Sequence, residues 1–309
     1  MTDAAVEPKN CLNCGAGLTG EYCASCGQPK EAYRRTVWSL FEELFEHLFS
    51  FDSRAWRALW TLISQPGELS AAYRDGQRAR YAPPLKFYLF TSLAMFITLS
   101  VSGLAIMQIQ PQPRDMQDDG KTFMLENFKA RIITFEKLPP RTRRMTREQV
   151  QALNAELEYS EDQTLYEQYK TGIARAALDP TMLNEQMTTW TPRLLFVLVP
   201  AMAAMLALFF RKKKVLLFVD HLVMAMHVHT FIFLMLMPAI FLAAFVPGDF
   251  ILWGLLFIIA TYFILAVKRF YAQSWPRTLI KGVLAGGLYY FLFMLPGLIL
   301  VLVLSIMNA

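Results

Sequence analysis

An acid–imidazole group lies inside one long apolar segment of the chain, Val215–Val246. It consists of Asp220, His221, His227 and His229, which include three of the chain's four histidines. Ionisable groups in a membrane segment are costly, so they usually face protein, a cavity or a bound ligand. A carboxylate one or two helical turns from an imidazole can fix its tautomer or raise its basicity. The group could therefore relay protons, bind a metal, or only pack and hydrogen-bond.

The helical period predicts where these side chains point. At ~100° per residue, Asp220 and His227 share one face of a helix. His221 and His229 lie within ~80° of each other on another face. Because His227 and His229 are ~160° apart, we expect their partners to come from different neighbouring elements. This spacing counts against a single metal ion bound by three histidines of this helix.

The cysteines predict a second chemical centre near the N-terminus. They form two CxxC pairs, each followed by a glycine: Cys11, Cys14, Cys23 and Cys26. Two such pairs suit tetrahedral four-sulfur ligation, and each glycine permits the positive-φ turn that aims backbone N–H groups at sulfur. Disulfides are the alternative, but residues 1–10 lack the apolar core of a secretory signal, which favours reduced thiolates. We expect a structural zinc ribbon with no open coordination site for catalysis.

The chain that carries these groups has the composition of a membrane protein. Of its 309 residues, 55% are hydrophobic, and the mean hydropathy is positive. Five apolar runs are candidate spans: Leu85–Met107, Pro192–Phe210, Val215–Val246, Phe250–Val267 and Val283–Met307. The third would be ~48 Å long as a straight helix, so we expect it to project from the bilayer, tilt or bend at Pro238. The predicted fold is an all-α polytopic membrane protein with about five transmembrane helices, a small N-terminal zinc ribbon and a helical extracytoplasmic insertion.

Basic residues in the short loops predict the orientation. Arg211–Lys214 joins the second and third spans, and four basic residues separate the fourth from the fifth. The opposite short loop, residues 247–249, has none. Under the positive-inside rule the basic loops and the N-terminus are cytoplasmic. The net charge of +5 follows from these loops, so a nucleic-acid partner has little support.

These boundaries divide the chain into five regions. They are a zinc ribbon (1–30), an amphipathic juxtamembrane module (31–84), a first transmembrane helix (85–107), a helical extracytoplasmic segment (108–190) and a four-helix transmembrane region (191–309). In the fourth region, Leu125, Phe128, Ile132 and Phe135 recur at helical spacing and predict an amphipathic helix. That region contains no Cys or His, so a metal site there has little support.

A basic cluster precedes and opens the first span. It consists of Arg74, Arg78, Arg80 and Lys86. At the inner leaflet these side chains could contact anionic lipid headgroups. The alternative is an ordinary topology-setting cluster whose long side chains snorkel to the interface.

A family resemblance rests on the residues between the ribbon and this span. A P-G turn followed by G-x-R-x-x-Y-x-x-P resembles the bacterial domain-of-unknown-function family number 3667, and the matching residues are Pro66, Gly67, Tyr73, Gly76, Arg78, Tyr81 and Pro84. The third span is similar to that family's acidic-His…His-x-His pattern, with Asp220 where the family pattern has glutamate. The resemblance implies a multi-pass protein of the bacterial inner membrane with a cytoplasmic zinc ribbon. It implies no activity.

Three classes of function remain open. The first is a non-enzymatic accessory or regulatory membrane protein whose ribbon contacts a protein partner. The second is a transporter-like component for a lipid or small solute, with an Asp/His relay in the third span. The third is an intramembrane metal-binding enzyme. The first is preferred because the chain has no GxSxG, HExxH, P-loop or dinucleotide motif. The sequence leaves the substrate, the partner and the oligomeric state open.

Overall fold

The computed structural model describes residues 10–30, 53–102, 107–111, 128–132, 180–210, 216–243 and 245–307. The chain divides into two compact units. The first comprises residues 1–95, 198–236 and 253–291, and the second comprises residues 96–197, 237–252 and 292–309. The start of the predicted juxtamembrane module, the basic loop Arg211–Lys214 and most of the predicted extracytoplasmic segment lie outside the described residues.

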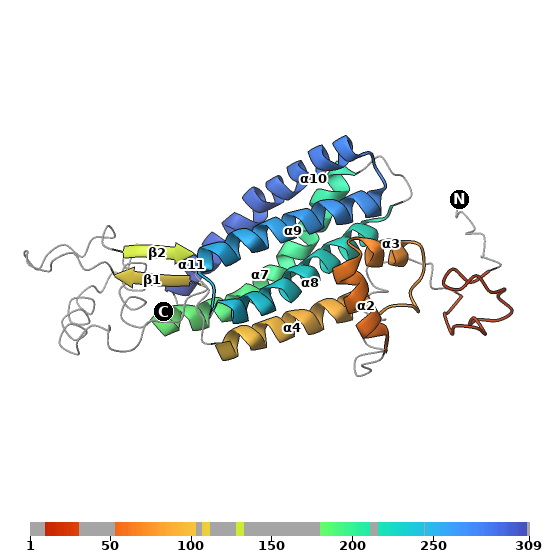
Figure 1. The fold of residues 1–309 in the computed structure, drawn as a ribbon, viewed down its shortest axis with the longest axis horizontal. Coiled ribbons are helices and arrows are strands. Elements are labelled where there is room, and N and C mark those ends of the chain that lie inside the picture. The colour runs from red at the N-terminus through yellow and green to blue at the C-terminus, as the bar shows by residue number, and fades with distance from the viewer. Residues whose placement is uncertain are drawn as a thin grey trace, which may run out of the picture. The chain divides into compact units, whose positions relative to one another are not determined.

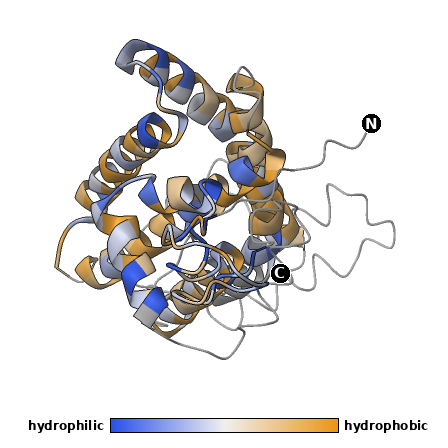
Figure 2. Ribbon diagram, turned by 90° about the vertical axis from the view of Figure 1, so that its right-hand side faces the viewer, coloured by the Kyte–Doolittle hydropathy of each residue, from blue (hydrophilic) through white to orange (hydrophobic). Residues whose placement is uncertain are grey.

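Among the described residues, five helices are long and apolar enough to cross a membrane. They are α4 (Pro84–Ser102), the Trp190–Phe209 part of α7 (Pro180–Phe209), α8 (Phe218–Leu242), α9 (Gly248–Tyr271) and the helical run Trp275–Met307 (Figure 1). Figure 2 shows hydrophobic residues along these helices. The prediction of a helical, multi-pass membrane protein is confirmed.

The α8 helix is the most enclosed of these spans. Just over half of its apolar window, 56%, is buried, against 22–33% for the other four. Ring stacking ties it to a neighbour in the first unit, because Phe231 and Tyr262 of α9 stack with their centroids 3.5 Å apart. A span covered on so much of its surface by protein can hold polar side chains without exposing them to acyl chains. The third span was expected to project, tilt or bend at Pro238. The α8 helix begins at Phe218 and continues as one helix through Pro238.

A glycine lets the short helix α3 (Glu68–Arg74) pack directly on the backbone of α9. Gly67 precedes α3 with a φ of 81°. A Cβ atom at Gly67 would lie 2.6 Å from the carbonyl oxygen of Ala266. Only glycine fits, because both the left-handed backbone and the close approach exclude a side chain. The P-G turn seen in the sequence is therefore a helix-packing contact.

The last span is a composite helix that begins earlier than predicted. It runs through α10 (Trp275–Tyr289), a π-helical turn (Tyr290–Met294) and α11 (Leu295–Met307). Trp275–Pro276 opens it, since proline is favoured in the first helical turn. The π turn lies just before Pro296, whose ring would otherwise clash with the carbonyl four residues back.

The second unit contains a two-stranded antiparallel sheet. β1 (Met107–Pro111) pairs with β2 (Phe128–Ile132), with Met107 opposite Ile132. The helix predicted from Leu125, Phe128, Ile132 and Phe135 is therefore wrong over 128–132. The physical reason is that Phe128, Ala130 and Ile132 also alternate with period two, and pairing with β1 selected that period.

We predict that Gly67→Ala destabilises the protein by on the order of 2 kcal/mol, because it adds backbone strain and a clash with the α9 backbone. The apparent melting temperature in detergent should fall by several degrees. Gly254→Ala is the control, since a Cβ there meets nothing within 4 Å in the interior of α9, so stability should stay equal or rise. Equal melting temperatures for wild type and Gly67→Ala would contradict the assigned contact.

Candidate metal centre and buried polar site

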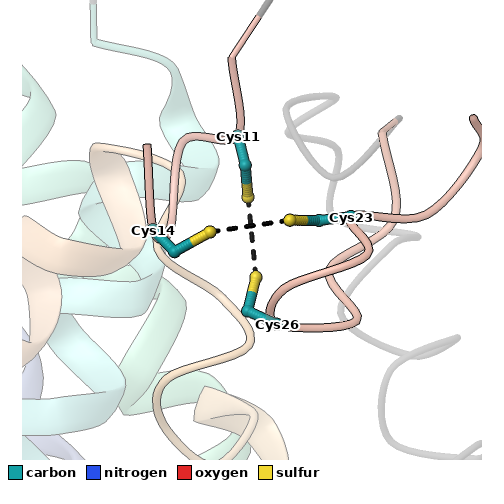
Figure 3. A group of neighbouring side chains, drawn as sticks. All are labelled: Cys11, Cys14, Cys23 and Cys26. Atoms are coloured by element: carbon teal, nitrogen blue, oxygen red, sulfur yellow. Dashed lines mark hydrogen bonds between the residues drawn. The ribbon is translucent and has the colours of Figure 1, made fainter. Parts of the chain in front are cut away.

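The four cysteine sulfurs converge on one point (Figure 3). Their Sγ atoms all lie within 4.8 Å of one another. Cys11 and Cys26 are 3.6 Å apart at sulfur, and Cys14 and Cys23 are 3.5 Å apart, so these are free thiols and not disulfides. A tetrahedral ion with sulfur ligands at about 2.3 Å would have sulfurs about 3.8 Å apart. The geometry fits a tetrahedral four-sulfur metal centre.

Two matching backbone turns position these sulfurs. The Gly15 N–H donates to the Cys11 carbonyl at 2.8 Å, and the Gly27 N–H donates to the Cys23 carbonyl at the same distance. Both glycines have positive φ, at 78° and 72°. The second turn repeats the first because both pairs have the sequence Cys-x-x-Cys-Gly. The positive φ predicted for both glycines is confirmed, and their N–H groups donate to carbonyl oxygens.

The protein environment favours the thiolate at Cys26. Burial raises the pKa of this thiol. Hydrogen bonds from the Asn13 side chain and the Gln28 backbone lower the pKa by more than burial raises it, so the result is about 6, below the ordinary value for cysteine. A thiolate is the form of cysteine that binds metal. At Cys14 the backbone hydrogen bond from Ala16 lowers the pKa, but the side-chain hydrogen bond with Cys23 and burial raise it, to about 12, so the two thiols are shifted in opposite directions.

One buried glutamine side chain fastens the ribbon to the loop after α3. Gln28 Nε2 donates to the Gly76 carbonyl at 2.9 Å. Gln28 Oε1 accepts from the backbone N–H groups of Arg78 and Ala79, both at 3.2 Å. Both ends of the amide are used, so the ribbon has a fixed orientation on this loop. Sequence reasoning missed Gln28, whose only signal is its place directly after Cys26-Gly27.

Gly76 completes the contact between ribbon and loop. Its φ is 87°, and a Cβ there would lie 2.6 Å from Leu12 Cδ1. Glycine therefore serves both the left-handed turn and the close approach of Leu12. This gives a physical reason for the glycine in the G-x-R-x-x-Y-x-x-P pattern.

The acid–imidazole group of α8 faces protein, as expected for polar groups in a span. Asp220, His221, His227 and His229 are each at most 4% exposed. Asp220 caps its own helix, because Oδ2 accepts from the Leu217 N–H at 2.9 Å. The carboxylate thus satisfies a backbone donor at the helix start.

His221 and His229 each bond to a tyrosine of a different helix. His221 Nδ1 lies 2.6 Å from the Tyr271 hydroxyl, at the end of α9. His229 Nδ1 donates to the Ala225 carbonyl at 2.8 Å, because a carbonyl can only accept. Its Nε2 therefore accepts from the Tyr289 hydroxyl of α10 at 3.1 Å. Neither pairing was predicted from the sequence.

His227 bonds to Ser70 of α3 and has one ring nitrogen left over. Nδ1 lies 2.8 Å from Ser70 Oγ, whereas buried Nε2 has no hydrogen-bond partner among the described residues. His227 also lines a small pocket. The rest of the lining comes from α3, the loop after it and the start of α4: Leu69, Tyr73, Gln77, Arg78, Tyr81, Ala82, Pro83 and Pro84. Of the group on α8, His227 is the one that lines this pocket.

The four basic residues predicted to contact headgroups have different environments. Arg74 bonds both Asp75 oxygens, at 2.7 and 2.9 Å, which raises the pKa of Arg74, and it also donates to the Phe270 carbonyl. Arg78 lies over the Tyr73 ring at 4.7 Å. The other two are held by rings as well: Arg80 by Tyr81 and Lys86 by Phe90. Within this set, only Arg78 lines the pocket.

The comparison with protein families identifies the segment that forms most of this site. Residues 52–96 match the model of a protein family of unknown function, DUF3667. This confirms the predicted resemblance over that segment. A search of the curated proteins and a search of the solved structures each found no match.

The DUF3667 segment connects the cysteine centre to α8. It supplies the loop that Gln28 holds, the serine that bonds His227 and every pocket-lining residue other than His227. The pattern residues Tyr73, Arg78 and Tyr81 all line the pocket, with Arg78 over the Tyr73 ring. The residues of the family pattern thus have two roles. Gly76 contacts the ribbon, and Tyr73, Arg78 and Tyr81 form part of the pocket wall.

We predict that Gln28→Ala frees the loop while leaving the cysteine centre intact. The amide hydrogen of Ala79 should exchange about tenfold faster, since it loses its acceptor, whereas the Arg78 N–H also donates to the Gly76 carbonyl at 3.0 Å and should change less. Hydrogen exchange with mass spectrometry measures this. Gln77→Ala, in the same loop, is the control and should leave both amides protected. Unchanged exchange in Gln28→Ala would show that the ribbon is not held by this side chain.

Proposed function

We propose that this chain is a non-enzymatic accessory or regulatory protein of the bacterial inner membrane. In this proposal its zinc ribbon is cytoplasmic and contacts a protein partner. The observation that carries the proposal is the hydrogen bonding of Gln28, which joins the ribbon rigidly to the membrane-anchored loop. A ribbon fixed in this way can pass the effect of partner binding to the helices beneath it.

The metal we propose is zinc, in a structural role. Four cysteines in a tetrahedral arrangement are the usual ligand set of structural zinc sites. Four thiolates fill the coordination shell, so the ion would have no open position for a substrate. The ribbon holds only 21 described residues, too few for a hydrophobic core of its own, so the metal would supply its folding energy.

The cytoplasmic orientation is supported by the charges around α3. Its residues contact the C-terminal end of α9, through Glu68 with Arg269 at 3.5 Å and through Arg74 with the Phe270 carbonyl. That end of α9 carries Lys268 and Arg269 in its last turn. Under the positive-inside rule these basic residues favour the cytoplasmic side, and the ribbon binds the loop directly after α3.

The separate partners of the histidines favour this proposal over an intramembrane metalloenzyme. Ser70, Tyr271 and Tyr289 lie on three different helices, and each bonds one imidazole. Among the described residues, the cysteines are the one His/Cys/Asp/Glu group close enough to share an ion.

We predict about one zinc per chain in protein purified without chelators, measured by elemental analysis. Cys11→Ser should lose most of this zinc, because three thiolates hold the ion less tightly than four. His227→Ala should keep it. Zinc that persists in Cys11→Ser but disappears in His227→Ala would contradict the assignment and favour a metal in the membrane region.

The partner contact can be tested by site-specific photo-crosslinking in the cells that make the protein. Tyr22 is 63% exposed on the ribbon, whereas Leu12 contacts the chain's own Gly76 loop. A photoreactive residue at Tyr22 should form a defined adduct with one second protein, and the same residue at Leu12, which is 42% exposed but lies against Gly76, should form less of it. The adduct should vanish when Cys11→Ser is added. Absence of any adduct from Tyr22 and the other exposed ribbon positions would refute the partner role.

A further inference from the structure

The unpaired nitrogen of His227 is a hydrogen-bond donor. Among the described residues, the hydroxyl of buried Ser70 bonds His227 Nδ1, at 2.8 Å. With the ring proton on Nδ1, that N–H would donate to Ser70 Oγ, and both the serine hydroxyl hydrogen and the Nε2 lone pair would be unpaired. With the proton on Nε2, Ser70 donates to Nδ1 and a single donor, Nε2–H, stays unpaired, so we assign this tautomer. Because Nε2 is buried without a partner, the site needs an acceptor at that position.

The lining of the pocket is suited to an anion. It contains the guanidinium of Arg78 and no acidic residue. In α3 and the loop after it, Glu68 pairs with Arg269 and Asp75 pairs with Arg74. Stacking on the Tyr73 ring, 4.7 Å away, orients the Arg78 guanidinium. Arginine in this setting is suited to oxyanions such as phosphate.

The size and place of the pocket fit part of a phosphate group. Its cavity of about 10 Å³ admits roughly one water or one oxygen atom. The wall includes Pro83 and Pro84, where the first span begins, so the pocket lies at the end of a membrane helix. Lipid headgroups occur at that depth. One phosphate oxygen can enter and reach His227, while the rest of the group stays at the mouth.

We propose that this pocket binds a phosphate group, with Arg78 pairing with its charge and His227 Nε2–H donating to one oxygen. The chemistry is shared by the headgroup of an anionic phospholipid and by free inorganic phosphate. Of the four basic residues predicted to contact headgroups, this assigns the specific role to Arg78. The proposal does not depend on the zinc or on a partner for the ribbon.

The test uses full-length protein in nanodiscs of phosphatidylcholine with a minor share of phosphatidylglycerol, followed by native mass spectrometry in detergent. Wild type should retain about one phosphatidylglycerol molecule per chain. Arg78→Gln and His227→Phe should each reduce this retention by about tenfold or more, because each removes a charged or charge-assisted hydrogen bond. Retention equal to wild type in Arg78→Gln would overturn the proposal.

Two matched variants separate binding from folding. Arg80→Gln removes the same charge two residues away, from a side chain outside the pocket lining, and should retain lipid as wild type does. His227→Gln restores an N–H donor near the position of Nε2 and should recover most of the retention lost in His227→Phe. An equal loss in Arg78→Gln and Arg80→Gln would show a diffuse charge effect and overturn the site.

The source of the phosphate is decided by a second arm. Delipidated protein is titrated with inorganic phosphate by calorimetry, with sulfate-free buffer and the Arg78→Gln variant in parallel. Binding that needs Arg78 in this titration, without selective lipid retention, identifies free phosphate as the ligand. Selective lipid retention alone identifies the headgroup. Binding in neither arm refutes the proposal.

Discussion

A polar side chain buried in a membrane helix must find its hydrogen-bond partner within the protein, and this requirement governs the first unit of the structure. The α8 helix places three imidazoles and a carboxylate out of contact with lipid. Water and acyl chains cannot satisfy these groups there, so α3, α9 and α10 each supply a hydroxyl, while Asp220 bonds its own helix end. Three neighbours are thereby fixed in register against one helix, by directional bonds that apolar packing alone does not provide.

The contact of α3 with α9 sets the position of Ser70, which bonds His227. Gly67 removes the side chain that would hold the two backbones apart, and Arg74 donates to the Phe270 carbonyl near the end of α9 while lying over the Phe270 ring. A cation at a helix C-terminus is favoured by the helix dipole. Together these contacts bring Ser70 to His227 Nδ1, which leaves Nε2 buried without a partner among the described residues. A seven-residue helix would not be stable in isolation, so its place depends on these interactions.

The ribbon and the membrane helices meet on a single loop. Gly76, Arg78 and Ala79 bind Gln28 through their backbone, and the Arg78 side chain lines the pocket. One loop therefore lies between the cysteine centre and buried His227. Its backbone bonds Gln28 of the ribbon, and its Gln77 and Arg78 side chains line the pocket with His227. This arrangement explains why the DUF3667 segment combines glycines, an arginine and tyrosines within a few residues. The glycines permit close approach, and the others form the wall of the pocket.

Local patterns in the sequence determined the five apolar helices, the cysteine turns and the burial of the polar residues of α8, because hydropathy, glycine spacing and helical period act over a few residues. The same locality explains the errors. Phe128–Ile132 satisfies both a helical and a strand period, and only pairing with Met107–Pro111 decided between them. Each histidine's partner was beyond sequence reasoning, since Ser70, Tyr271 and Tyr289 lie 157, 50 and 60 residues from the imidazoles they bond. Only the packing of whole helices brings such residues together, and that packing also decided which of four similar basic residues faces the pocket.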